Sequence, residues 1–475
     1  MSYFQSNAPI QCAIAMILYF GVLLGISRYR SRSATLSDYM IGSRNSIWWL
    51  VSLGMLSESI SAVTYLSVPG SVTTQQYGYL QVVMGYIVGY LFIAYVLIPL
   101  YYRHKIISIY SYLGDRFGST ARKTGASIFI LSRLFGTSAR LYLALIILHN
   151  LLIPAGTISP VISFTVAMAL IVAYTYKGGI KSIIWTDAFQ SIMLLLGIFA
   201  VISTVWGLLP NPLEVALKPQ MFFWDPLQKN FFFKQFFGGM CLTVAMNGLD
   251  QNVMQKSLSC KNGSEAKKNM VWLSVTDSLA NGVIVVMGAL ALEVYRKYQY
   301  TLGASDHLVS DLVFQHLSPM VSVFFVLGIT GAAFGSGGSV LPPLASSIEL
   351  DLLPKRWQNR MPVRALHVLV AILMLEIITL LYHFQSDSMI NVIYKFAGFT
   401  YGPLLGLFLI GIFTKWKLRD RWIPVTAILS CLITALLDRN CVAWFSGYQF
   451  GFELIAVNAL TFIGLSSLAR EAAIR

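Results

Sequence analysis

Charged residues are scarce in this sequence, because only 11% of its 475 residues are Asp, Glu, Lys or Arg. A soluble protein carries about 25% charged residues. Hydrophobic residues make up 56% of the chain, and so few polar residues cannot cover the outside of a water-soluble fold. The composition therefore predicts an integral membrane protein and overrides the roughly three soluble domains that length alone would suggest.

Motifs of nucleotide-dependent and hydrolytic enzymes are missing as well. The sequence has no P-loop, HExxH, GxSxG or dinucleotide fingerprint. Its five cysteines are scattered, without the spacing of a metal site or a disulfide framework. The net charge of +14 does not indicate a nucleic-acid partner, because the basic residues fall in short loops between apolar segments. An enzyme is thus the least favoured class of function.

Long apolar segments dominate what is present. About 20 apolar residues span a bilayer, and by this criterion the sequence predicts an all-α protein with thirteen membrane spans. Their ranges are 8–27, 45–67, 77–102, 125–151, 158–176, 183–208, 231–255, 270–292, 317–349, 365–383, 388–413, 422–437 and 451–469. The connecting segments are too short for a sensor or kinase domain. We therefore expect one polytopic membrane domain over residues 1–475, whose first span is not a cleaved signal peptide.

The basic residues predict the orientation of these spans. Lys and Arg accumulate in cytoplasmic loops, and thirteen spans would place 25 of the 34 basic residues, including Lys256, on one side and six on the other. The N-terminus is then outside and the C-terminus cytoplasmic, in a plasma (inner) membrane.

Among the ionisable side chains within predicted spans, seven are candidates for a functional role. An ionisable group in the bilayer costs at least about 2.5–3.5 kcal/mol on insertion scales, so each is a functional candidate unless it is paired or lies near an interface. They are Glu58, Arg133, Arg140, Asp187, Asp277, Glu376 and Lys395. Structural pairing is the favoured interpretation for Asp277, Glu376 and Arg133, and a functional role is favoured for Asp187 and Arg140.

Three spans carry polar or glycine-rich segments that a lipid-facing helix would not need. Residues 57–64 hold three serines, a threonine and Glu58; residues 331–339 hold four glycines with Ser336 and Ser339 on one helix face; and residues 398–403 read GFTYGP. Small-residue helix packing explains such segments structurally. Interrupted helices whose carbonyls and hydroxyls bind a cation explain them functionally, and they predict a secondary transporter with its site at mid-membrane. A cation held between Asp187 and the hydroxyl of Ser339 would give that carboxylate a partner.

Gly178-Gly179-Ile180 followed by Trp185-Thr186-Asp187 and Gln190 resembles the signature of the sodium:solute symporter family. Similar, less specific matches are Ser61-Ala62-Val63-Thr64-Tyr65, Tyr112-Leu113-Gly114-Asp115-Arg116-Phe117-Gly118, Asp250-Gln251 with Gln255, and Gly402-Pro403-Leu404-Leu405-Gly406-Leu407-Phe408. The resemblance implies a LeuT-like core of two inverted five-helix repeats with discontinuous helices. The first repeat begins near 45, residues 45–255 contain it together with the first helix of the second, and the second occupies 231–413. An extra helix at 8–27 precedes the core and two helices at 422–469 follow it.

The resemblance also implies ligands for sodium. The main site matches backbone carbonyls and hydroxyls of Ser57, Ile60, Ala332, Gly335 and Ser336, although the family usually has Ser or Thr where this chain has Gly335. A second site, present in some members, matches Asp187, Gly338 and Ser339, and here too one hydroxyl is absent. Substrate-binding positions implied by sialic acid transporters are Ser61, Thr64, Gln81 and Arg140.

The resulting hypothesis is sodium-coupled uptake of a small polar solute by alternating access. Arg140 and the hydroxyls of Ser61 and Thr64 favour an anionic solute such as a monocarboxylate or acidic sugar. The expected partners are the solute, sodium ions and the lipid bilayer, without nucleic acid. Proton-coupled symport of a sugar or amino acid through Glu58 and Asp187 is the alternative, and a channel-like or sensory protein is a third. Glu58 could instead bind a cationic substrate or pair with Arg140 or Lys395.

Overall fold

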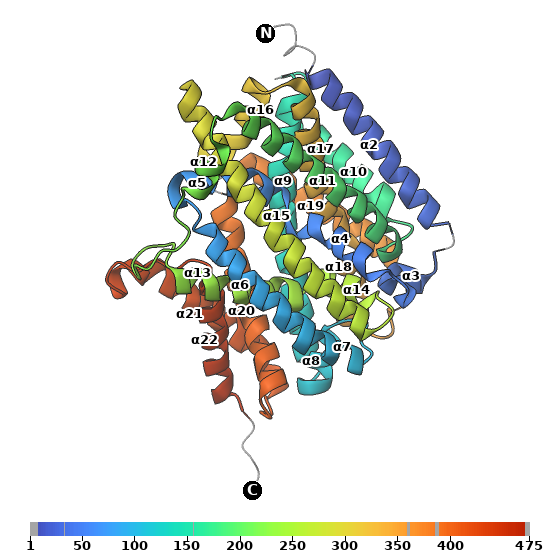
Figure 1. Cartoon of the computed structure of the whole chain (residues 1–475). Helices are drawn as coiled ribbons and strands as arrows, with labels where there is room; N and C mark the ends of the chain where they lie inside the picture. Colours follow the sequence, from blue (N-terminus) through green and yellow to red (C-terminus); the bar gives the residue numbers. More distant parts are fainter. Residues whose placement is uncertain (1–7, 33, 155, 359–361, 385–388, 471–475) are drawn as a thin grey trace.

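The structure is a computed structural model (Figure 1), and it describes residues 8–470 except 33, 155, 359–361 and 385–388. These residues form helices and two isolated bridges, with no strand. The helices of ten or more residues are α2 (Ala8–Arg30), α4 (Trp48–Ser59), α5 (Ala62–Gln75), α6 (Tyr79–Phe92), α9 (Ser119–Leu152), α10 (Pro160–Thr175), α11 (Ile180–Leu208), α13 (Phe232–Thr243), α15 (Gly263–Tyr298), α17 (Pro319–Ser339), α19 (Val363–Phe384), α20 (Met389–Phe413), α21 (Ile423–Trp444) and α22 (Leu454–Leu468).

Shorter helices and turns join or extend these elements. They are α3 (Leu36–Ile41), η1 (Gly42–Arg44), η2 (Ile93–Leu97), α7 (Ile98–Arg103), α8 (Tyr110–Phe117), α12 (Pro212–Leu217), η3 (Val244–Gly248), α14 (Gln251–Leu258), η4 (Ser305–His307), α16 (Leu308–His316), α18 (Leu341–Ser347), η5 (Ile348–Leu352) and η6 (Asp420–Trp422). Three of them, η2, η3 and η5, are π-helical segments that continue the preceding helix. Single π-turns of this kind occur often at functional sites.

Each of the thirteen predicted ranges coincides with helical segments. Within the described part of the chain, eight helices are long and apolar enough to cross a membrane, and the bent pair α4–α5 makes nine. Shorter apolar helices are Pro160–Thr175, Gly398–Phe413 and Leu454–Leu468. The structure is thus an all-helical membrane-type fold, and the count of thirteen spans stays a prediction.

Helix α17 lies at the centre of the molecule. It packs against α2, α4, α9 and α11, and 78% of the apolar stretch that begins with it is buried. By contrast, α2 lies along one edge of the molecule, and α21 and α22 lie at the opposite edge (Figure 1). On α2 the side chains of Ile10, Ile14, Ile17 and Leu18 are exposed. An apolar stripe of this kind on an outer helix fits contact with lipid.

Two helices are interrupted where the chain changes direction. Helices α4 and α5 meet at a bend of 60°, and the residues between them, Ile60 and Ser61, leave the helical conformation with ψ of 78° and 167°. Asp250, between η3 and α14, is extended with φ −111° and ψ 123°. The break at 60–61 confirms the expectation from residues 57–64. The expected break at 398–403 is wrong, because α20 continues through Pro403.

Small residues hold α11 and α17 close together. A Cβ atom on Gly331 would lie 2.5 Å from the carbonyl oxygen of Gln190, and one on Gly197 would lie 2.8 Å from that of Phe324. Both approaches are shorter than a carbon–oxygen contact allows, so only glycine fits. The packing interpretation of the glycine-rich segment is therefore correct for Gly331.

We expect Gly331→Ala to lower the free energy of unfolding by about 1–3 kcal/mol, because overpacking forces the two helices apart. Thermal unfolding of the purified protein in detergent measures the change. Gly282→Ala on α15 is the matched control, since nothing lies within 4 Å of a Cβ there. Equal unfolding temperatures for the two variants would contradict the close contact.

Candidate functional site

The end of α4 presents a buried carboxylate beside unwound backbone. Glu58 is buried at 6% exposure, one residue before α4 ends at Ser59. Because the helix stops there, the carbonyls of its last turn lack the amide partners that a continuing helix supplies.

Lys256 is the direct partner of this carboxylate. Its ammonium donates to Glu58 Oε2 at 2.7 Å, to Asp187 Oδ2 at 2.6 Å and to Ser339 Oγ at 2.9 Å. The residue lies on α14 and is 1% exposed. Its placement in a cytoplasmic loop was therefore wrong. Hydropathy alone could not separate it from neighbouring loop lysines, because α14 is short and polar.

The ammonium of Lys256 therefore occupies the position between Asp187 and Ser339, where the sequence predicted a bound cation. Asp187 and Ser339 lie together, with Ser339 Oγ donating to Asp187 Oδ2 at 2.7 Å. Gly338, the third residue assigned to this site, faces Tyr174, whose hydroxyl would lie 1.9 Å from a Cβ at that position. The Tyr174 hydroxyl donates instead to the carbonyl of Phe334 at 2.6 Å. A side chain at Gly338 is excluded by this tyrosine.

A second ion pair lies beside the first. Arg133 Nε donates to Asp250 Oδ2 at 2.6 Å, and the Tyr401 hydroxyl donates to the same oxygen at 2.5 Å. Arg133 also donates to the carbonyl of Met246 at 3.0 Å, and it lies 4.0 Å from Glu58 Oε1. The pairing interpretation of Arg133 is correct. Asn252 completes the group by donating to Glu58 Oε1.

Two of the residues assigned to the main sodium site, Ser57 on α4 and Gly335 on α17, lie side by side. A Cβ on Gly335 would lie 2.7 Å from Ser57 Oγ and 3.3 Å from Gln190 Oε1. Ser57 therefore places a hydroxyl where a Ser or Thr side chain at Gly335 would extend, which gives a physical reason for the glycine. Ser336 Oγ donates to the carbonyl of Ala332 at 2.9 Å, and Ile60 lies at the break itself.

Other intramembrane charges behave differently from expectation. Asp277 on α15 is fully buried and forms no ion pair with any described residue, whereas Glu376 on α19 is exposed. The side chain of Lys395 lies outside the described residues. The described part of the chain also holds no cluster of three His, Cys, Asp or Glu residues that could bind a metal ion.

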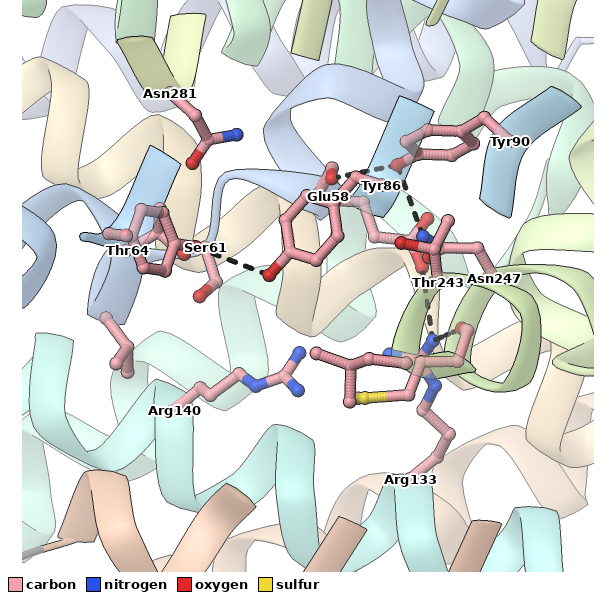
Figure 2. Close-up of a pocket in the computed structure, with 15 residues that line it drawn as sticks. Glu58, Ser61, Thr64, Tyr86, Tyr90, Arg133, Arg140, Thr243, Asn247 and Asn281 are labelled. Atoms are coloured by element: carbon pink, nitrogen blue, oxygen red, sulfur yellow. Dashed lines mark hydrogen bonds and ion pairs between the residues drawn. The ribbon is translucent and has the colours of Figure 1, made fainter. Parts of the chain in front are cut away.

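A cavity opens next to the break, with an empty volume of ≈ 770 Å³. Ser61, Thr64 and Arg140, three of the four positions that the resemblance implies for substrate binding, line it together with Glu58 and Arg133. In Figure 2 the guanidinium of Arg140 is directed into the cavity from α9.

Gln81 is not among the residues that line this cavity. Its amide donates to the carbonyl of Asn230 at 2.8 Å and to that of Gly78 at 3.2 Å, and its oxygen accepts from the backbone N–H of Phe223 at 3.2 Å. The side chain therefore fastens the loop before α13 to the start of α6.

Sequence reasoning missed the tyrosines and asparagines of the cavity. Tyr79, Tyr86 and Tyr90 line it from α6, and Asn247 and Asn281 line it from η3 and α15. Tyr90 joins two of these elements, because its hydroxyl hydrogen-bonds Ser59 Oγ and Asn247 Nδ2, both at 3.2 Å. The spacing of the three tyrosines, seven and four residues, places them on one helix face, and that periodicity was a usable signal.

Comparison with known proteins agrees with this architecture. The model of the sodium:solute symporter family matches residues 39–419. The human sodium/iodide cotransporter is 25% identical over 416 residues, which cover 83% of this chain and 63% of that protein. A putative sodium-dependent multivitamin transporter of Drosophila melanogaster is 26% identical over 432 residues, covering 84% and 70%. Mus musculus sodium-coupled monocarboxylate transporter 2 is 23% identical over 420 residues, covering 81% and 65%.

Solved structures show the same fold. A Na⁺-coupled sialic acid symporter, in a substrate-bound outward-open state, matches with a TM-score of 0.81 at 19% identity, over 96% of this chain and 97% of that one. A nucleobase-cation-symport-1 family transporter matches with a TM-score of 0.53 at 14% identity, over 92% and 94%. These relatives are named as transporters and not as enzymes. This chain spans less than two thirds of the human cotransporter, 63%. Since the family model covers most of it, from residue 39 to 419, the chain belongs to the sodium:solute symporter family.

Proposed function

We propose that the protein is a sodium-coupled symporter that carries a small anionic organic solute, such as a monocarboxylate or an acidic sugar, into the cell. The cavity beside the α4–α5 break is the observation that carries the proposal. Its charged lining residues are Arg133, Arg140 and Glu58. Glu58 accepts from Lys256 and Arg133 donates to Asp250, while the guanidinium of Arg140 is directed into the cavity and favours an anionic solute.

Hydroxyl and amide groups complete a site for a polar solute. Ser61 and Thr64 start α5, whose first amides lack partners within the helix, and helix N-termini favour anions. Tyr86, Asn247 and Asn281 offer further hydrogen bonds from three other elements.

The main sodium site of the proposal consists of Ser57, Ile60, Ala332, Gly335 and Ser336. Support comes from the meeting of the α4 end with α17, from the non-helical conformation of Ile60 and from the buried side-chain oxygens of Ser57 and Ser336. Hard cations prefer such carbonyl and hydroxyl oxygens.

The proposed topology has thirteen spans, with residues 1–475 forming one membrane domain in the plasma membrane, the N-terminus outside and the C-terminus cytoplasmic. Each of the two inverted repeats would begin with a broken helix. This helix is α4–α5 in the first repeat and α13–α14 in the second. The breaks at 60–61 and 249–250 support this arrangement. Solute, sodium and lipid are then the partners. Proton coupling gains no support, since Glu58 and Asp187 both hold Lys256.

We expect an inward sodium gradient to drive solute accumulation in proteoliposomes. One positive charge moving down 100 mV releases about 2.3 kcal/mol, and the coupling between sodium and solute is reciprocal. Thermal-shift screening of monocarboxylates and acidic sugars, with and without sodium, identifies the solute to use. Uptake that a pH gradient alone sustains, and that ignores sodium, would contradict the proposal.

Arg140→Gln should weaken binding of the anionic solute by about 10–100-fold, because a hydrogen bond to a charged group contributes about 1.5–3 kcal/mol. Competition uptake assays give the affinity. Arg140→Lys keeps the charge and should lose less, and Arg296→Gln, at an exposed arginine, is the matched control. If Arg140→Gln weakened binding of a neutral analogue by the same factor, Arg140 would not recognise the negative charge of the solute.

Ser336→Ala should raise the sodium concentration for half-maximal uptake about tenfold, equivalent to about 1.4 kcal/mol, because one oxygen ligand is lost. Ser322→Ala is the control, buried on the same helix but about 21 Å away at 1.5 Å per residue. If the sodium concentration for half-maximal uptake rose equally in Ser336→Ala and Ser322→Ala, the assignment of Ser336 to the main sodium site would be refuted.

A further inference from the structure

The ammonium of Lys256 lies at the junction of four helices. Its three oxygen partners come from the end of α4 (Glu58), from α11 (Asp187) and from the end of α17 (Ser339), while Lys256 belongs to α14. A lysine ammonium has three donors and no acceptor. All three donors are therefore satisfied, at distances of 2.6, 2.7 and 2.9 Å. This is a complete coordination shell and not a chance contact.

The same shell has the chemistry of an alkali-ion site. Its members are two carboxylates and a hydroxyl, all oxygens and all buried, which are the ligands that hard cations take. Asp187 Oδ1 has no hydrogen-bond partner among the described residues, so one more oxygen is available there. Only a positive charge makes the shell stable, because two buried carboxylates without a cation would repel each other.

We propose that Lys256 is a tethered cation that occupies the second sodium position of this fold, so that the protein binds one sodium ion, at the main site. The inference depends on the proposed sodium-coupled function and defines its ion stoichiometry. A free sodium ion at Asp187 and Ser339 would have to displace a cation that is covalently attached to the chain. Removal of the ammonium, with the carboxylates left in place, converts the position into a second sodium site.

The balance of charges around Lys256 supports the conversion of this position into a sodium site. Glu58 and Asp187 carry two negative charges against one on Lys256, while Arg133 is bound to Asp250 at 2.6 Å. Replacing Lys256 by alanine removes one positive charge and leaves a space among the same oxygens. One sodium ion restores both the charge and the contacts.

The test is the number of sodium ions bound by the purified full-length protein, measured by equilibrium dialysis with radioactive sodium. We expect one per chain for the wild type and for Lys256→Arg, and two for Lys256→Ala. Asp187→Asn in the Lys256→Ala background should return the number to one. The unfolding temperature of Lys256→Ala should rise more steeply with sodium concentration than that of the wild type, by mass action.

Two sodium ions in the wild type, or one in a folded Lys256→Ala variant, would overturn the inference while sodium-driven uptake still held. No bound sodium in the wild type would instead overturn the proposed function. If Lys256→Ala does not fold, Lys256→Ala with Glu58→Gln leaves a single carboxylate and gives the same readout. One sodium ion in that folded double variant would overturn the inference as well.

Discussion

Buried charges in a low-dielectric interior have to be neutralised by partners, and here two ion-pair groups do so where two helices break. Lys256 joins Glu58 and Asp187, and Arg133 joins Asp250. Removing one partner of a buried pair costs about 3–5 kcal/mol, because the other charge is left uncompensated. The two groups therefore fix the end of α4, the break before α14 and the central helix α17 in one arrangement. The cavity and the proposed main sodium position both border this arrangement.

The interrupted helices and the small residues of this fold depend on each other. A helix that stops inside the membrane leaves carbonyls and amides without partners, which is tolerated only where protein or a polar cavity covers them. Glycines on α11 and α17 let backbones approach within contact distance, so that the unwound segment is covered by protein. Gly335 has a further role, because its missing side chain leaves room for the hydroxyl of Ser57. The departure of this chain from the usual Ser or Thr at Gly335 thus has a geometric cause.

Much of the fold and part of the site followed from sequence. All thirteen ranges chosen by apolar length coincide with helical segments, and the density of hydroxyls at 57–64 identified the break at 60–61. Ser61, Thr64 and Arg140 line the cavity, whereas Gln81 fastens a loop. The same local reasoning failed at 398–403, where α20 accommodates Pro403 because neighbouring helices support it. It also missed the break at Asp250, although Gly248 lies two residues before it.

The sequence by itself determined that the protein is a helical membrane protein, and its motif around Asp187 indicated the family, because composition and short motifs are local properties of the chain. It also indicated that Asp187 needs a partner, for which a cation was one candidate. Only the tertiary structure decided which cation that is. Lys256 is 69 residues away from Asp187 along the chain, and nothing in its neighbourhood distinguishes it from a loop lysine. Its burial depends on how α14 packs after the break, and such long-range pairing is not encoded in any single segment.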